Sequence, residues 1–181
     1  MALKSTVFKV DLQLADLDRH HYADYPLTIA RHPSETDERM MIRLLAFALF
    51  ASERLRFGRG LSDEDEPALV EDDLTGRITH WIEVGLPDER RITRACGRAD
   101  RVSVIAYGGN AARMWWQGIE NRLGRQKKLR VLALDPEESQ AMAAMAARTM
   151  RLSATIQDGT LLFGDGASAL NLHPRALLGA D

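Results

Sequence analysis

The sequence predicts an α/β fold in which a mixed central sheet is flanked by helices, with added β-hairpins at the N-terminal and C-terminal ends. Short segments near both ends alternate apolar and polar residues, which is the pattern of half-buried strands. Between residues 87 and 136, helical periodicity alternates with short apolar runs, which favours a partly parallel sheet. A chain of 181 residues can bury one substantial core, so we expect a single domain over residues 1–181.

The first predicted elements are a β-hairpin and a long helix. The alternating residues 7–14 predict one strand, and residues 26–30 predict the returning strand after a long connection. Ser34 is followed three residues later by Asp37 and then by an apolar run, so Ser34 is placed to cap a helix. We therefore expect the main buried helix over residues 35–52.

The remaining elements follow from the same periodicities and from turn residues. Residues 56–66 hold two glycines and an acidic cluster, which predict a loop. Asp158-Gly159 is the strongest hairpin signal in the sequence, and the last residues of the chain are expected to fray. The predicted segments are strands at 69–72, 77–84, 101–107, 129–134, 151–157 and 160–163, and helices at 87–97, at 110–123 and from Pro136 onward.

Charge and cysteine content narrow the possible functions. The chain has 24 Lys and Arg against 26 Asp and Glu, a formal net charge of −2, so any nucleic-acid site has to be a local patch. Cys96 is the one cysteine, which excludes an intrachain disulfide and favours a reducing, cytoplasmic location. No apolar run approaches the ~20 residues of a membrane helix. We expect a monomer without a membrane segment.

Glu83 is the first candidate for a metal site. It lies near the carboxyl end of the strand at 77–84 and points away from the most apolar face of that strand. Open α/β sheets usually bind ligands beyond such strand ends. A hairpin turning at residues 73–76 brings Asp65 and Glu66 close to Glu83, and one residue of register decides which of them faces it. These three carboxylates are predicted to hold Mg²⁺ or Mn²⁺, although a solvated or salt-bridged Glu83 is a plain alternative.

A third carboxylate position is offered by the main helix. Glu38 lies on the inward edge of its N-terminal turn and could assist the metal site. Its favourable place in the helix dipole explains an acid there equally well. Asp73, at the hairpin tip, is too far from Glu83 to share an ion and is expected to serve the turn.

Several long phrases of the sequence carry a family resemblance. They are RHPSETDERMMIRLLAFALFA, DEP, DLTG, WIEVGLPDERRITRACGRAD and YGG, with WW soon after the last. Together they resemble the YaeQ family, and the resemblance extends from Met1 through the Asp158-Gly159 hairpin. It implies a variant of the PD-(D/E)XK restriction-endonuclease-like fold, which many metal-dependent nucleases share. The elements expected from residue 34 to about residue 107 follow the order of that fold.

The sequence departs from the last motif of that superfamily, which is an acid, any residue, and then a lysine. The matching segment here is Glu83-Val84-Gly85, so Gly85 occupies the lysine position. Some superfamily members resemble this chain in moving the cation to the following helix, which makes Arg91 and Arg94 candidates for its replacement. Arginine can hold a phosphate but is a poor proton donor, and a solvated basic helix face explains these residues as well.

Two hypotheses follow for the function. In the first, the chain is a Mg²⁺-dependent nuclease of DNA or RNA, in which the carboxylates named above hold the ion and Arg91 or Arg94 steadies the phosphate. In the second, the nuclease-like fold is catalytically inactive and has become a nucleic-acid-binding or protein-binding regulatory module. Gly85 at the lysine position and the acidic net charge motivate the second hypothesis, whereas the nuclease-like fold implied by the resemblance gives slightly more weight to the first.

Weaker signals concern basic and isolated polar residues. The segment 122–130 is rich in Arg and Lys and follows Trp115 and Trp116, a combination that could contact phosphates and stack bases. A helix end followed by a solvated loop explains that segment too. His80 shares the apolar face of its strand and Cys96 the apolar side of its helix, so both are expected in the core.

Overall fold

The computed structural model describes residues 4–59 and 65–179. Within them the chain forms helices and strands in the order β1 (Thr6–Asp16), β2 (His21–Arg31), α1 (Asp37–Phe50), β3 (Leu55–Phe57), β4 (Leu69–Asp72), β5 (Ile78–Val84), α2 (Glu89–Arg98), β6 (Arg101–Ala106), α3 (Asn110–Leu123), β7 (Leu129–Ala133), α4 (Pro136–Ala143), β8 (Thr149–Gln157), β9 (Thr160–Gly164), β10 (Ala169–Leu172) and β11 (Arg175–Leu178). None of the described helices is long and apolar enough to cross a membrane.

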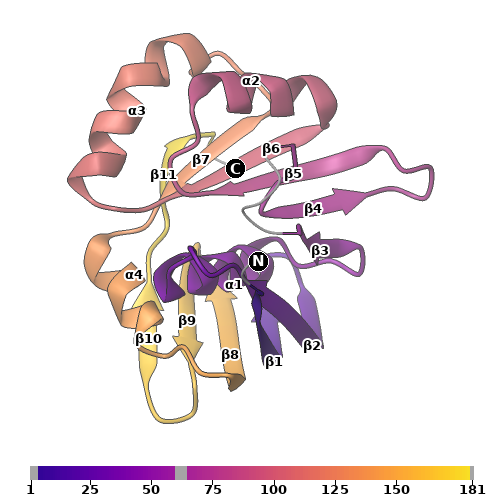
Figure 1. Ribbon diagram of the computed structural model, residues 1–181, viewed down its shortest axis with the longest axis vertical. Coiled ribbons are helices and arrows are strands. Elements are labelled where there is room, and N and C mark those ends of the chain that lie inside the picture. Colours follow the sequence, from indigo (N-terminus) through magenta and orange to yellow (C-terminus); the bar gives the residue numbers. More distant parts are fainter. Residues whose placement is uncertain (1–3, 60–64, 180–181) are drawn as a thin grey trace.

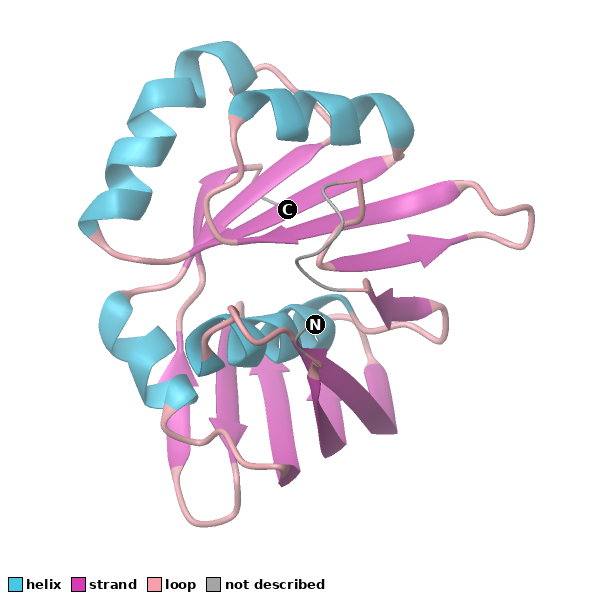
Figure 2. Cartoon of the chain, in the orientation of Figure 1, coloured by secondary structure: helices cyan, strands magenta, loops and turns pink. Residues whose placement is uncertain are grey.

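Two sheets and the helices are stacked in layers (Figure 1). A six-stranded sheet has the order β11-β7-β6-β5-β4-β3, and a five-stranded sheet has the order β10-β9-β8-β1-β2. Helices α1 and α4 lie between the sheets, whereas α2 and α3 cover the outer face of the six-stranded sheet (Figure 2). The outer face of the five-stranded sheet carries no helix in the described part of the chain.

The six-stranded sheet confirms the predicted α/β alternation. Strands β5, β6 and β7 are parallel, and α2 and α3 are the connections between them. Strands β4 and β5 form the predicted antiparallel hairpin, with Leu69 opposite Ile82. At its tip the Asp73 carboxylate accepts hydrogen bonds from the backbone N–H groups of Thr75 and Arg77, at 2.8 Å and 3.0 Å, so Asp73 is the turn residue that was expected.

Both predicted terminal hairpins are present, as β1-β2 and β8-β9, but they form a second sheet that the sequence did not predict. They unite into the five-stranded sheet because β1 pairs in parallel with β8, for example Lys9 with Thr149. The first hairpin is also tighter than expected, since β2 already begins at His21 and only four residues connect the strands. The sequence of β2 alternates only weakly between apolar and polar residues, because β2 is an edge strand and most of its side chains are partly or fully exposed.

The start of α1 differs from the prediction by two residues. Thr36, and not Ser34, is the N-cap, and its hydroxyl accepts a hydrogen bond from the backbone N–H of Arg39 at 3.1 Å. The Ser34 hydroxyl instead lies 2.6 Å from Nδ1 of His32. Helix α1 then ends at Phe50, earlier than expected.

Three strands escaped the sequence analysis. β3 overlaps the segment 56–66 that was predicted as a loop, and β10 and β11 follow residue 163, after which no strand was predicted. β3 pairs with β4 and β11 pairs with β7, so both are edge strands of the six-stranded sheet. Their side chains alternate too briefly to signal a strand, and their pairing partners hold them in place.

Candidate functional site

Glu83 is buried. The face of β5 from which it projects was predicted correctly, but this face is covered and not open to solvent. Trp81 and Glu83 project from the same face of β5, and α2 covers that face, which leaves Glu83 only 4% exposed. Its Oε1 accepts hydrogen bonds from Nε1 of Trp81 and from Nε of Arg91, both at 2.7 Å. A buried carboxylate needs such partners, because desolvation penalises its charge.

Arg91 joins three parts of the fold at Glu83. It stands in the first turn of α2, where its backbone N–H donates to the Asp88 carboxylate at 2.8 Å. Besides its bond to Glu83, one terminal nitrogen of its guanidinium donates to the backbone carbonyl of Glu66 at 2.7 Å. Arg91 therefore ties α2 to β5 and to the segment that precedes β4.

Asp65 and Glu66, the other predicted metal ligands, bind arginines of their own. Asp65 accepts a hydrogen bond from Arg94 at 2.9 Å, in a pair whose side chains are 68% and 49% exposed. The Glu66 carboxylate accepts from the backbone N–H of Arg59 at 2.8 Å and lies 3.4 Å from the Nε of that residue. Within residues 4–59 and 65–179, no three His, Cys, Asp or Glu side chains are grouped to hold a metal ion. Among the described residues, Asp65, Glu66 and Glu83 therefore do not converge as the several oxygen ligands that Mg²⁺ requires.

Glu38 belongs to a different polar cluster, at the N-terminal end of α1. Its carboxylate accepts a hydrogen bond from the Ser139 hydroxyl of α4 at 2.5 Å. Nearby, Glu35 receives two hydrogen bonds from Arg43, at 2.7 Å and 2.8 Å, inside the protein. Burial raises the pKa of Tyr107, which lies beside this cluster. These groups hold α1 against its neighbours, so Glu38 has a structural partner of its own.

The two candidate cations therefore have different partners. Arg91 contacts Glu83, and Arg94 contacts Asp65. Gly85, where the expected motif would have a lysine, has a φ of 109°, and its N–H donates to the carbonyl of Ile105 at 2.9 Å. Because this backbone conformation disfavours residues with a side chain, a lysine would be strained there.

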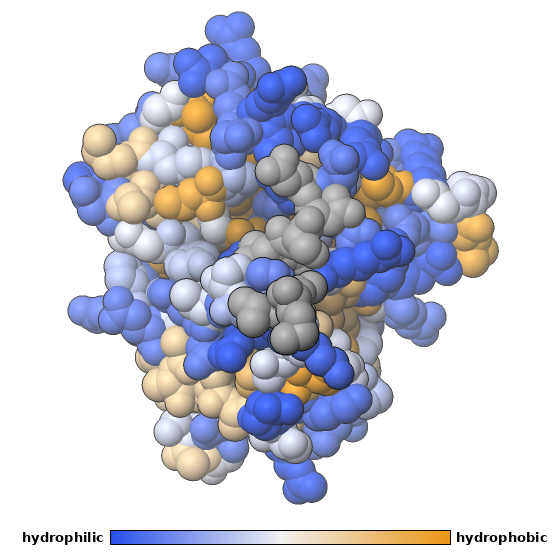
Figure 3. All heavy atoms as spheres, viewed as in Figure 1, coloured by the Kyte–Doolittle hydropathy of each residue, from blue (hydrophilic) through white to orange (hydrophobic). Residues whose placement is uncertain are grey.

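Positive charge gathers in the layer outside the six-stranded sheet. Residues 86–130, from the turn before α2 into the start of β7, hold eleven Arg and Lys but four Asp and Glu, in a chain whose net charge is −2. Arg101 and Arg130 project from the inner face of the sheet, towards Glu71 and α1, which leaves nine of these cations to the outer layer. Its exposed cations on α2, at the end of α3 and in the loop after α3 are together called the basic face. They are Arg90, Arg94, Arg98, Arg122, Arg125, Lys127 and Lys128. Hydrophilic side chains crowd this end of the molecule in Figure 3.

Two contacts hold the parts of the basic face together. Arg122 near the end of α3 lies 2.6 Å from Glu89 in the first turn of α2. Lys128 donates to the carbonyls of Cys96 and Ala99 at the end of α2, each at 3.1 Å. In the sequence, the arginines of α2 and the basic segment 122–130 are two separate signals. Counting charge along the whole stretch would have found the combined face.

Several cations of the basic face form no ion pair with a described carboxylate. In the described residues, no ion pair joins Arg90, Arg98, Arg125 or Lys127 to a carboxylate. Arg98 instead lies over the ring of Trp81, 5.3 Å from its centre. Arg90, Arg98, Arg125 and Lys127 are all exposed to solvent.

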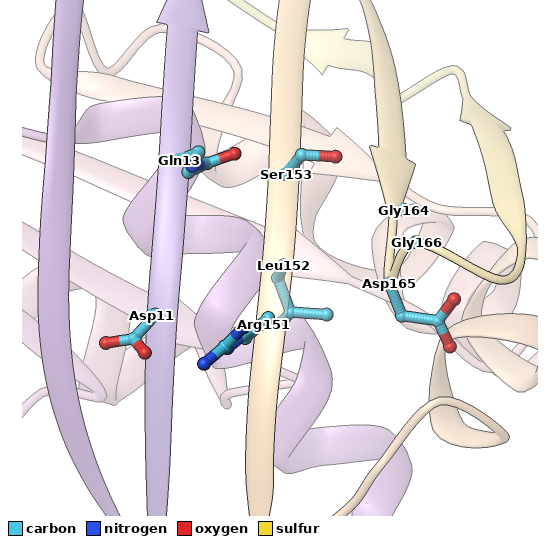
Figure 4. A pocket seen from close by; sticks show the side chains of 8 residues that line it. All are labelled: Asp11, Gln13, Arg151, Leu152, Ser153, Gly164, Asp165 and Gly166. Atoms are coloured by element: carbon cyan, nitrogen blue, oxygen red, sulfur yellow. The ribbon is translucent and has the colours of Figure 1, made fainter.

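A hollow on the open face of the five-stranded sheet offers a contrast (Figure 4). It has a volume of about 430 Å³, and its charged lining residues are Asp11, Arg151 and Asp165. Asp11 and Arg151 stand side by side on β1 and β8. This surface is mixed in charge, so it provides no field for a polyanion.

His80 and Cys96 lie in the core, as predicted. Nε2 of His80 is 2.8 Å from the Ser103 hydroxyl, and its ring meets Phe50 edge-on at 4.9 Å between centres. Burial is the main cause that lowers the pKa of His80 to about 4. Cys96 is buried, and burial raises the pKa of its thiol. Neither residue is placed as an exposed reactive group.

Comparison with known proteins places the whole fold in one family. The family model described as YaeQ protein matches residues 1–174. The chain is 49% identical to YaeQ of Salmonella typhi and 48% identical to YaeQ of Escherichia coli K12, in each case over 174 residues that cover 96% of both chains. The crystal structure of YaeQ from Xanthomonas axonopodis pv. citri has a TM-score of 0.94 at 46% identity, covering 97% of this chain and 99% of that one. The crystal structure from Pseudomonas syringae has a TM-score of 0.93 at 41% identity, with 97% of each chain covered. The chain therefore belongs to the YaeQ family.

Proposed function

We propose that this protein is a nucleic-acid-binding module that holds phosphates on the basic face and is not a metal-dependent nuclease. The observation that carries the proposal is the local surplus of positive charge on the outer side of the six-stranded sheet, where residues 86–130 place nine Arg and Lys but four Asp and Glu, in a chain with a net charge of −2. Surface charges act over about 8 Å at physiological ionic strength, so a ligand at this face responds to the local excess and not to the net charge. Arginine is suited to this role because its N–H fork can hold two phosphate oxygens.

The geometry around Glu83 favours binding over metal-dependent cleavage. A Mg²⁺ ion at Glu83 would have to displace Arg91 from a carboxylate whose side chain is only 5% exposed. It would also have to recruit Asp65 and Glu66 away from Arg94 and Arg59. Each exchange gives up an existing ion pair, and the arrangement has no lysine beside Glu83 to stabilise charge on a phosphate.

Binding of a labelled nucleic acid, followed by fluorescence anisotropy over a salt series, tests the proposal. The double variant Arg90→Gln/Lys127→Gln removes two positive charges from the basic face. Lys9→Gln/Arg151→Gln removes the same charge from the exposed side of the five-stranded sheet and is the matched control. Each lost phosphate contact lowers the slope of log K against log salt by about 0.9 for a duplex.

In Arg90→Gln/Lys127→Gln we expect weaker binding and a salt dependence that is shallower by about two in the magnitude of the slope. The control should behave as wild type. Equal losses in both double variants would show that net charge, and not this face, governs binding. Wild-type protein that binds no nucleic acid at low salt would refute the proposal.

A further inference from the structure

The basic face has no aromatic platform. The three tryptophans of the chain all lie in or beside α2, α3 and β5, but Trp81 is 3% and Trp116 is 8% exposed. Trp115 is half-buried, and its indole N–H donates to the carbonyl of Pro87 at 2.6 Å. Among the described residues, the aromatic side chain with large exposure is Tyr22, which belongs to β2 of the other sheet.

We infer that the basic face binds the phosphate backbone of a double helix and stacks no bases, an inference that rests on the proposed nucleic-acid binding. Proteins that bind single strands without sequence preference usually combine a basic groove with aromatic rings on which bases stack. Here the rings are turned inward, and the ring of Trp81 is covered by Arg98 of the face itself. The basic face therefore offers positive charge to a phosphate backbone but no exposed aromatic ring on which a base could stack.

The spacing of the cations suits a ligand of high charge density. Arg90, Arg94 and Arg98 follow one another at intervals of four residues, so they form one stripe on α2. Eight residues of helix rise by about 12 Å, and a duplex presents about seven phosphate charges over that length. A single strand without stacking contacts offers fewer charges to the same stripe and gains nothing from its bases.

A comparison of three DNA probes of equal length tests this inference. The probes are a duplex, one of its strands with bases, and the same strand with abasic sites throughout. We expect the duplex to bind most tightly and with the steepest salt dependence, about 0.9 per contact against about 0.7 for single strands. The strand with bases and the abasic strand should agree within about twofold, because a single stacked base is worth roughly 5- to 150-fold in affinity.

The outcomes separate this inference from the proposed function. A strand with bases that binds more than about fivefold more tightly than the abasic strand, or more tightly than the duplex, overturns the inference and leaves nucleic-acid binding standing. Failure of all three probes to bind overturns both. In Arg90→Gln the salt slope for the duplex should fall by about 0.9, while the ratio between the two single strands stays unchanged.

Discussion

Nε of Arg91 lies 2.7 Å from Oε1 of Glu83, beneath α2. The acid that the superfamily motif selects as a metal ligand is thus neutralised by one of the arginines that the same resemblance selects as the phosphate cation. Because both side chains are largely buried, their ion pair affects the stability of the whole fold and not only the binding of a ligand. The pair joins α2 to the sheet and, through Glu66, fixes the segment before β4.

Removal of Arg91 should therefore destabilise the protein. In Arg91→Met the Glu83 carboxylate stays buried with only the Trp81 N–H, and we expect a loss of about 3 kcal/mol in the free energy of unfolding. Adding Glu83→Gln should recover most of this loss, since it removes the uncompensated charge. Urea unfolding measures both variants. Additive losses in the double variant would show that the two side chains do not act as a pair.

Arg94→Met is the matched control for Arg91→Met. Its pair with Asp65 is exposed to solvent, so we expect a change below about 1 kcal/mol. A loss as large as that of Arg91→Met would mean that helix propensity or packing, and not the buried ion pair, explains the result.

Divalent metal ions should not stabilise the protein. An ion bound only to the folded state, at about a hundred times its Kd, would add about 2.7 kcal/mol of stability. Because Glu83, Asp65 and Glu66 bind separate groups, we expect the same Tm in Mg²⁺, in Mn²⁺ and in EDTA. A Tm increase with Mg²⁺ that disappears in Asp65→Asn would instead support the nuclease hypothesis.

His80 should make stability depend on pH in a defined window. Burial lowers its folded pKa to about 4 from 6.5, so between these values the unfolded chain binds more protons than the folded protein. The contribution of the buried, neutral His80 to the free energy of unfolding is therefore fully present above pH 6.5. It is lost, by about 3 kcal/mol, as the pH drops towards 4. The difference in unfolding free energy between wild type and His80→Gln isolates this contribution from that of the carboxylates. A difference that is constant across the window would contradict it.

The N-cap of α1 can be tested by two alanine substitutions. Thr36→Ala removes the hydroxyl that accepts from Arg39 and should cost about 1 kcal/mol. Ser34→Ala leaves the cap intact and should change stability by less than about 0.5 kcal/mol. Unfolding in urea compares the two, and a larger effect at Ser34 would mean that the cap lies there after all.

Much of the central sheet was predictable because its signals are local. Helix α3 and the hairpin β4-β5 were placed within a residue, since their periodicity and turn residues lie inside each segment. The side of β5 on which Glu83 lies was also predictable from alternation. The burial of Glu83 could not be predicted in this way, because it depends on the packing of α1 and α2 against the two faces of β5.

The sequence by itself determined the family, most helices and strands, and the stretch of residues 86–130 that carries the positive charge. Only the tertiary structure decided that β1 pairs with β8, that Arg91 binds Glu83, and that Asp65 and Glu66 bind other arginines. Composition and periodicity are properties of neighbouring residues, whereas a charged side chain is paired with whatever the packed layers bring within about 3 Å of it. The candidate carboxylates could be named from the sequence, but their partners depend on how helix, strand and loop pack together, even where the two residues are only seven or eight positions apart, as in Glu66 with Arg59 and Glu83 with Arg91.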